Sequence, residues 1–456
     1  MSERIRRMAG LIKPLTQASF TLFLVLSLTT PSWRYGPFSW FPLWQGEEVA
    51  GAPVTIGAFN LLPLFLVTSL LVDRLAGDKW RRWQWGRWGI TLPFLGLTLL
   101  GLLSLDLLSP RRMFIHAGGL AIAWLVYLVI LNERPSLTLP LSLVLMIQGG
   151  VALAQFSVQR EVGLAGLGEL PLNPGWQGIT VLFARDTRWL RAYGLTAHPN
   201  LLGALLAVLL LLLWPAYGRL RGWRQAAVGM ALAAGCAGLF VSFSRAAWLG
   251  FSAGMLAWGF WTVKRRQSHA ISAPCSLRFL WPFIPSLLLF LAYNDLALSR
   301  FADLDSPIEA RSLDERSVDA GIALQLIGDH PWRGVGLGNY TGYAQAIAPD
   351  ANRVHNAPLL VTAELGLPGG LLWLLLALFP FFITLPSRRP AAPSSCRSFT
   401  PYQLGLWLAM LLMSQFDTMV WVSSNWQTAV LFALMAVQMA REMTAYELSG
   451  KPAAAA

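Results

Sequence analysis

The sequence predicts an all-α polytopic membrane protein, because its composition is too apolar for a soluble chain of this size. Hydrophobic residues make up 55% of the 456 positions and charged residues only 13%, far less charge than a water-exposed surface needs. Apolar runs of about 20 residues, long enough for a helix to cross a hydrocarbon core of ~30 Å, recur along the chain. The 21 tryptophans fit aromatic belts at the two membrane surfaces.

We predict about twelve membrane-spanning helices within a single integral membrane domain, residues 1–456. The first follows four basic residues and lacks a small-residue cleavage site, so it is expected to be an anchor and not a signal peptide. The spans are expected near residues 14–30, 53–72, 89–108, 113–131, 137–157, 199–215, 225–242, 246–263, 278–294, 358–385, 402–417 and 425–440.

The distribution of basic residues predicts the orientation. With the N-terminus in the cytoplasm, 22 of the 35 Lys and Arg residues fall in the inner segments, as the positive-inside rule requires. Both termini are then cytoplasmic. The basic clusters explain the net charge of +12 as topology signals that touch lipid headgroups, so no nucleic-acid partner is expected.

Two long segments face outward in this topology, residues 158–198 and the larger loop 295–357 between the ninth and tenth spans. Loops of this length usually carry function. The larger one is expected to be partly helical, with an amphipathic helix over 317–327 that His330-Pro331 ends. The run Gly334–Tyr340 resembles a nucleotide fingerprint, but no βαβ unit surrounds it, so it is expected to form turns.

Four ionisable side chains lie where these outer segments meet predicted helices. Arg191 precedes the sixth span, Arg245 lies in a tight turn between the seventh and eighth, and Arg316 is expected at the start of the amphipathic helix. His355 precedes the tenth span. Each has a structural alternative: the arginines could contact lipid phosphates or form salt bridges, and the histidine could simply be an interfacial one.

Taken together, these residues favour binding of a di-anion at the outer membrane surface. Arginine grips phosphate oxygens through bidentate, charge-assisted hydrogen bonds, and a histidine can accept a proton from a hydroxyl near neutral pH. Glu364, one to two turns into the tenth span, needs a partner there, and one of these arginines is expected to supply it. The sequence has no CxxC pair and no cluster of metal ligands, so no metal and no cofactor are expected.

Two motifs make the chain resemble the O-antigen ligase / O-antigen polymerase superfamily. His355-Asn356, followed after nine residues by Gly366-x-x-Gly369, is similar to the outer-loop motif of the ligases, and Arg191-x-x-x-Leu195 to a second motif. The resemblance covers nearly the whole length and implies a GT-C-like membrane fold. It also implies inverting, metal-independent transfer of a glycan from undecaprenyl diphosphate to an acceptor hydroxyl on the outer face of the cytoplasmic membrane.

The resemblance also implies roles for single residues. His355 would be the general base or would orient the acceptor. Arg191, Arg245 and Arg316 would bind the donor diphosphate, and Asn356 and Glu364 would support them. The partners would be the lipid-linked donor, a glycolipid or glycan acceptor and membrane lipids.

The acceptor stays open at this stage. Lipid A–core, the acceptor of the ligases, is one possibility. A polymerase of O-antigen or exopolysaccharide repeat units, and transfer to protein, are the alternatives. A membrane transporter, a different class, would place ionisable residues near mid-membrane, and the predicted spans are overwhelmingly apolar there.

Overall fold

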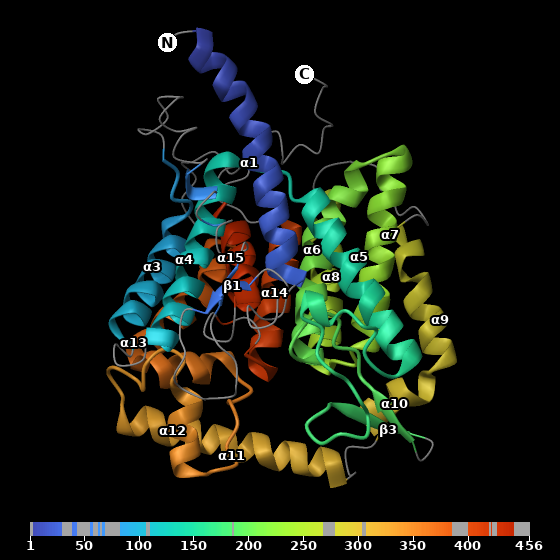
Figure 1. The fold of residues 1–456 in the computed structure, drawn as a ribbon, viewed down its shortest axis with the longest axis vertical. Coiled ribbons are helices and arrows are strands. Elements are labelled where there is room, and N and C mark those ends of the chain that lie inside the picture. The colour runs from blue at the N-terminus through green and yellow to red at the C-terminus, as the bar shows by residue number, and fades with distance from the viewer. Residues whose placement is uncertain are drawn as a thin grey trace.

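Long helices packed side by side form the core of the computed structural model (Figure 1). The structure describes residues 3–29, 39–42, 55–57, 63, 66–68, 83–105, 110–184, 187–267, 279–302, 307–384, 400–418, 421 and 426–441. The bundle helices are α1 (Glu3–Thr29), α3 (Trp88–Leu103), α4 (Pro110–Glu133), α5 (Thr138–Val158), α6 (Pro199–Arg219), α7 (Gly222–Val241), α8 (Arg245–Gln267), α9 (Ile284–Ala292), α13 (Ala357–Thr384), α14 (Pro401–Phe416) and α15 (Trp426–Ala440).

The predicted spans and the observed helices agree well, with two exceptions. Five of the described helices are long and apolar enough to cross a membrane, or six if a bent pair counts as one span, and three shorter apolar helices accompany them. The chain is therefore a helical membrane protein, and the count of twelve remains a prediction. The second predicted span, 53–72, is wrong at its start, where β2 (Thr55–Gly57) pairs with β1 (Ser39–Pro42); most of its remainder lies outside the described residues.

The ninth predicted span is shorter than expected. A short 3-10 helix, η4 (Trp281–Phe283), leads into α9, and the chain then turns by 88° into α10 (Asn294–Ala302). The polar pair Asn294-Asp295 at this bend explains the turn, because these side chains favour helix starts over a continued apolar span. The bend directs α10 back towards the bundle.

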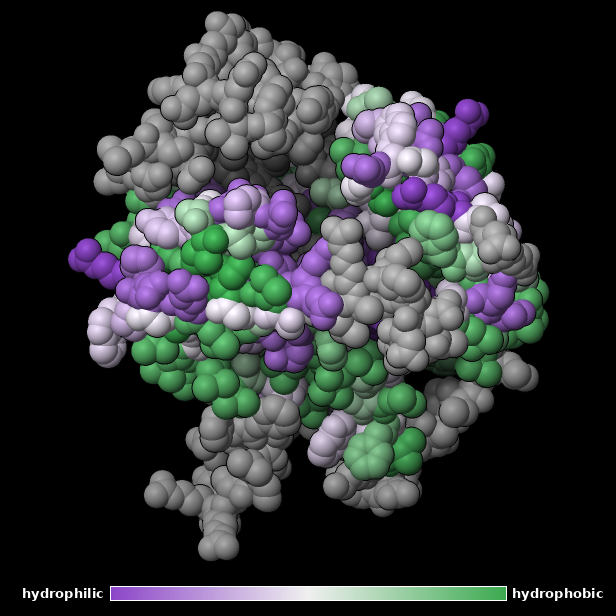
Figure 2. Space-filling model, turned by 90° about the horizontal axis from the view of Figure 1, so that it is seen from below, coloured by the Kyte–Doolittle hydropathy of each residue, from purple (hydrophilic) through white to green (hydrophobic). Residues whose placement is uncertain are grey.

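One end of the bundle is covered by further elements (Figure 1). The helices α11 (Pro307–Asp329) and α12 (Tyr340–Ile347) lie across this end, beside the hairpin of β3 (Val181–Ala184) and β4 (Thr187–Leu190). We call it the capped end. Figure 2 shows it from below, with a band of hydrophilic residues that reaches its middle. The larger predicted loop is therefore partly helical, as expected, and α1 begins at the opposite end.

Small residues bring α8 and α14 close together. Gly250 and Gly254 on α8 face Ala409 and Gly405 on α14, so that a Cβ added at Gly254 would lie 2.9 Å from the Gly405 carbonyl oxygen. Small residues four apart on both helices allow this backbone approach in a membrane, where packing and not apolar burial drives helix association. The approach carries the start of α8 towards the end of α14.

A break in α13 explains the glycine of the outer-loop motif. Gly366 has φ 70° and ψ −176° inside the helix, and its amide neighbour Leu367 donates to the Pro331 carbonyl at 2.7 Å. Because the Leu367 amide is used in this way and Pro368 has no N–H, the carbonyls of Ala363 and Glu364 lack their partners four residues on, and they accept instead from Val335 and Gly336, both at 2.9 Å. The nine-residue spacing therefore spans the helical segment between its start and its break.

The run Gly334–Tyr340 forms turns, as the sequence predicts. Gly334, Gly336 and Gly338 all have positive φ, a conformation that costs a residue with a Cβ roughly 1–2 kcal/mol. These turns supply the amides that satisfy the broken end of α13 and fix α11 and α12 against the bundle.

Replacing Gly366 with alanine is expected to lower the thermal unfolding midpoint. The new Cβ would stand 2.6 Å from the backbone carbonyl carbon of Trp332, in a conformation that already costs roughly 1–2 kcal/mol. Gly150→Ala on α5, where a Cβ meets nothing within 4 Å, is the matched control and should not lower it. The comparison is made by thermal unfolding in detergent micelles; equal midpoints for both variants would contradict this account of the break.

Candidate functional site

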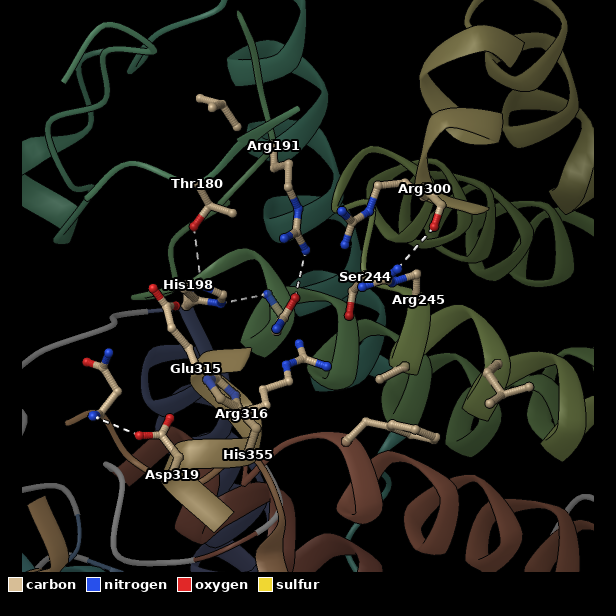
Figure 3. Close-up of a pocket in the computed structure, with 16 residues that line it drawn as sticks. Thr180, Arg191, His198, Ser244, Arg245, Arg300, Glu315, Arg316, Asp319 and His355 are labelled. Atoms are coloured by element: carbon tan, nitrogen blue, oxygen red, sulfur yellow. Dashed lines mark hydrogen bonds between the residues drawn. The ribbon is translucent and has the colours of Figure 1, made fainter. Parts of the chain in front are cut away.

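A polar cavity of about 600 Å³ lies at the capped end, between the bundle helices and α11. It brings together the four residues predicted from sequence as base and diphosphate ligands: His355, Arg191, Arg245 and Arg316. Its lining residues are Thr180, Val181, Arg191, His198, Asn200, Ser244, Arg245, Ala246, Leu249, Arg300, Glu315, Arg316, Asp319, Asn352, His355 and Phe416. We call this cavity the arginine pocket (Figure 3).

Arg191 is held rigidly at the inner wall of the arginine pocket. Its side chain is only 5% exposed; Nε donates to the Ser242 carbonyl at 2.9 Å and Nη2 donates to Asn200 Oδ1 at 2.7 Å. Ser242 ends α7 and Asn200 lies in the first turn of α6. A side chain fixed by two elements loses little freedom when it meets an anion, so Arg191 is a preorganised part of the wall.

Two buried glutamines of α5 place the segment that carries Arg191. Gln155 Oε1 accepts the amides of Tyr193 and Gly194 at 3.1 and 2.8 Å, and Gln148 Oε1 accepts the amide of Leu195 at 2.7 Å. Such polar groups in a span are costly unless satisfied. Here the amides of residues 193–195 satisfy both glutamines, and the same hydrogen bonds fix the path of the chain that follows Arg191.

Arg245 and Arg300 come from two different helices that meet at the opposite wall. Arg245 begins α8, and its Nη1 donates to the main-chain carbonyl of Arg300 near the end of α10 at 3.2 Å. In Figure 3 the guanidinium groups of Arg191, Arg245, Arg300 and Arg316 surround the same space. Arg300 was not predicted: its place depends on the bend before α10, which the sequence does not reveal.

Arg316 lies on the side of the arginine pocket formed by α11. The expectation that it begins the amphipathic helix is wrong, because α11 starts at Pro307; Arg316 is mid-helix, where the macrodipole argument does not hold. Within the described part of the chain, no hydrogen bond or ion pair joins Arg316 to another residue, and its side chain is partly exposed to the cavity. It is therefore the arginine best able to move onto a ligand.

His355 precedes α13 and faces the arginine pocket beside a buried carboxylate. Its Nδ1 lies 3.9 Å from Asp417 Oδ2, and the side chain of His355 is 35% exposed while that of Asp417 is 7% exposed. Burial raises the pKa of Asp417, but the His355 imidazole, together with His198 and Asn200, outweighs it and holds this pKa below its usual value. Because Nδ1 faces Asp417, Nε2 is the ring nitrogen left to meet a substrate.

A short chain of contacts links Arg191 to His355. Asn200 accepts from Arg191 through Oδ1 and donates through Nδ2 to Asp417 Oδ2 at 2.9 Å. Asp417 in turn faces His355. The chain passes between the start of α6 and the end of α14, so the predicted anion-binding and proton-accepting groups share one framework.

His198 also lines the arginine pocket, but its role is structural. It is the N-cap of α6, and its Nδ1 accepts the Asn200 amide at 3.1 Å. Nε2 then carries the hydrogen and donates to Thr180 Oγ1, 3.3 Å away. Burial, reinforced by Arg191, lowers the pKa of His198 to about 4, so this ring stays neutral and has no free nitrogen with which to accept a proton.

Asn356 caps α13 beside His355. Its Oδ1 accepts the Leu359 amide at 2.9 Å and its Nδ2 donates to the Gln415 carbonyl on α14 at 3.2 Å. An N-cap asparagine satisfies an amide that the helix itself leaves free. The histidine of the motif is thus fixed by the residue that follows it.

Glu364 lies away from the arginine pocket. It is fully buried, and its Oε2 accepts from Trp421 Nε1 at 2.9 Å. Its main-chain carbonyl accepts from Gly336, as described above. The described contacts of Glu364 thus point to the break in α13, whereas a partnership with one of the pocket arginines remains a prediction.

Comparison with known families adds a finding from sequence. Residues 230–374 match the family model described as O-antigen ligase. The matched segment belongs to the O-antigen ligase and polymerase family. It includes Arg245, Arg300, Arg316 and the motif from His355 to Gly369, so the family resemblance carried by this motif is confirmed, whereas the Arg191–Leu195 motif lies outside the match. A comparison with characterised proteins found no match to the chain.

The arginine pocket carries more positive than negative side chains. Four arginines line it against two carboxylates, Glu315 and Asp319. Asp319 is 4% exposed, and its Oδ1 accepts the Asn352 amide at 3.1 Å; burial raises its pKa despite this bond. Like charges brought together without water repel each other, so the pocket favours a multiply charged anion.

The sequence did not single out the following residues of the arginine pocket and its surroundings: Arg300, Asp319, Asp417 and the pair His198–Asn200 in its present role. Asp417 carried one signal: it is a lone acidic residue at the end of a predicted span. Among the described residues, no three His, Cys, Asp or Glu side chains come together as metal ligands.

Acid is expected to destabilise the folded protein through His198. Its pKa of about 4 lies below the ordinary 6.5, so the unfolded state binds more protons between these values and stability falls as pH falls through that window. His198→Asn keeps a side-chain acceptor at the N-cap and removes the titration. Its thermal unfolding midpoint should therefore fall less than that of the wild type between about pH 6.5 and 4; parallel curves would contradict this role for His198.

Proposed function

We propose that this membrane enzyme transfers a glycan from a polyprenyl diphosphate, undecaprenyl diphosphate in bacteria, to an acceptor hydroxyl at the outer face of the inner membrane. The observation that carries the proposal is the arginine pocket, where four arginines and one accessible histidine converge from distant parts of the chain. The family match supports lipid-linked glycan chemistry in a membrane.

The arginines suit the leaving group. When the bond between the sugar C1 and the diphosphate oxygen breaks, its electron pair stays on that oxygen and the diphosphate gains charge. Guanidinium groups around this position stabilise the charge as it develops, and Arg191, which is already held by two hydrogen bonds, does so without reorganising. Each charge-assisted hydrogen bond contributes roughly 1.5–3 kcal/mol. In this scheme the arginines provide the positive charge, and we expect activity without a metal.

His355 suits the acceptor. The acceptor oxygen attacks C1 as its proton passes to His355 Nε2, and the resulting imidazolium faces the Asp417 carboxylate across 3.9 Å. His198 is unsuited to this step because both of its nitrogens are engaged in hydrogen bonds. A single displacement of this kind inverts the configuration at C1, as the family resemblance implies.

The acceptor distinguishes a ligase from a polymerase, and the pocket is compatible with both. Ligation to lipid A–core is the leading proposal, with polymerisation of repeat units as the alternative. A null mutant separates them: single capped repeats indicate a polymerase, and intact polymer left on its lipid carrier indicates a ligase.

Reconstituted protein is expected to transfer glycan from a polyprenyl-diphosphate donor, and His355→Ala should reduce transfer to background. His355→Gln keeps a side-chain hydrogen-bonding group but no base, so it should be equally inactive. Donor binding to both variants should persist because the arginines remain. Product is followed by the mobility of labelled glycan, with and without chelator. Normal transfer by His355→Ala would remove its catalytic role, and solute uptake into liposomes with no transfer would indicate a transporter.

Alanine substitutions at Arg316 and at Arg191 are expected to differ in their effect on stability. Arg316→Ala should raise the KM for the donor about tenfold or more, because it removes one charge-assisted hydrogen bond to the donor. The thermal midpoint of this variant should stay unchanged, because no described residue is held in place by Arg316. Arg191→Ala should also lower the thermal midpoint, since it removes the bonds to Ser242 and Asn200.

Two further variants serve as controls for the arginine comparison. Arg316→Lys should restore donor binding only in part, because lysine lacks the planar fork. Arg188→Ala removes an exposed arginine that lies outside the pocket, where it stacks on Phe183 at 5.6 Å, and should leave the KM unchanged. A donor KM that Arg316→Ala does not alter would exclude Arg316 from the donor site.

A further inference from the structure

A second cavity, of about 360 Å³, lies among α7, α8, α9 and α10. Its walls are apolar and largely aromatic, and none of its lining residues is charged. Phe240, Trp248, Phe251, Phe283, Phe290 and Leu298 form most of the surface. We call it the aromatic groove.

The aromatic groove opens on the lipid-facing flank of the bundle. Phe290 and Leu298 at its rim are 40% and 53% exposed, and the adjoining surface of α9 carries exposed leucines. Ser252 of α8 also lies exposed in it. A chain from the bilayer can therefore reach the groove sideways without crossing a polar surface.

The aromatic groove shares two walls with the arginine pocket. On α8, Leu249 lines the pocket and the adjacent Trp248 lines the groove. On α10, Arg300 lines the pocket and Leu298, two residues before it, lines the groove. The bond from Arg245 Nη1 to the Arg300 carbonyl joins α8 and α10 where the two cavities adjoin.

We propose that the aromatic groove binds the isoprene units of the donor lipid that lie next to its diphosphate. The inference rests on the proposed function, since it concerns the tail of the donor whose headgroup occupies the arginine pocket. A molecule with a charged head and an apolar chain needs both environments within a few bonds. Of the described cavities, this groove is apolar, open to lipid and built on the same two helices as the pocket.

The position of the groove also explains the bend before α10. A straight ninth span would continue outward, whereas the 88° turn brings α10 over the groove and places Leu298 and Arg300 in successive walls. The short helix α10 would thereby contact both the headgroup and the tail of the donor lipid. Ordinary acyl chains of the bilayer are the competing occupants, and they would fill the groove without any effect on the reaction.

The test compares two donors with the same glycan and diphosphate. One carries a long polyprenyl chain, and the other, the short-chain donor, carries a methyl group on its diphosphate and no isoprene unit. Ser252→Trp fills the groove from its open side, and Leu298→Trp narrows its rim. Leu256→Trp is the matched control, because it adds the same ring to α8 at a position that is 73% exposed and outside the groove.

Both groove variants are expected to raise the KM for the long-chain donor about tenfold, the effect of losing roughly 60 Å² of buried apolar surface. The KM for the short-chain donor and kcat should stay unchanged, as should every constant of the control. Equal KM values for the long-chain donor in wild type and both groove variants would overturn the tail assignment alone. Absence of transfer from either donor by the wild type would instead overturn the proposed function, and the tail assignment with it.

Discussion

The hydrogen bond between Asn200 and Asp417 is the contact on which the arrangement of the site depends. It joins the first turn of α6 to the residue after α14, which are more than two hundred positions apart in sequence, at 2.9 Å. Asn200 uses its other side-chain atom to hold Arg191, and Asp417 faces His355. A buried carboxylate at a span end is costly unless it is satisfied, and here three polar partners satisfy it. Loss of Asn200 would remove one hydrogen bond from Arg191 and one from Asp417, and loss of Asp417 would take away the carboxylate that both Asn200 and His355 face.

This contact requires that α14 ends where α6 and α8 begin, and the packing of small residues provides that. Gly250 and Gly254 let α8 lie almost in backbone contact with α14. At the other wall, the glycine break in α13 turns the chain so that the Pro331 carbonyl receives the Leu367 amide. His355 at one end of this segment and Gly366 at the other are thus two requirements of one local structure, because the cap starts the helical segment and the break ends it.

Much of this site was predictable from the sequence, because its charged residues are rare and lie at helix ends. Arg191, Arg245 and His355 stood out as ionisable groups at junctions between apolar runs and polar loops, and the structure brings them into one cavity with Arg316. Such signals are local, and the cost of burying a charge makes them dependable. The break at Gly366 was not predicted, because the tenth span was expected to run without interruption over 358–385, although Gly and Pro lie within that apolar run.

The predictions that were wrong or missing concerned features that depend on tertiary contacts. The start of α11 was misplaced by ten positions because Pro307 initiates the helix within a polar stretch that shows no clear apolar period. Arg300 was missed because its place follows from a bend between two short helices. The different roles of His198 and His355 were also hidden, since they depend on which neighbours occupy each ring nitrogen. The spacing of residues in the sequence can show that a residue lies at a helix end, but it does not show which residues it contacts there.

The two carboxylates in the arginine pocket bear on turnover. If four arginines each contributed roughly 1.5–3 kcal/mol to a diphosphate, the spent carrier would dissociate too slowly for repeated reaction. Glu315 and Asp319 lie in the same pocket, so under the proposed function their negative charge would offset part of this attraction and weaken the product complex. The charge that develops during transfer still gains from the arginines, because it is larger than the charge of the bound donor. A pocket that binds its anion through partly compensated arginines can therefore favour the transition state over both the donor and the released diphosphate.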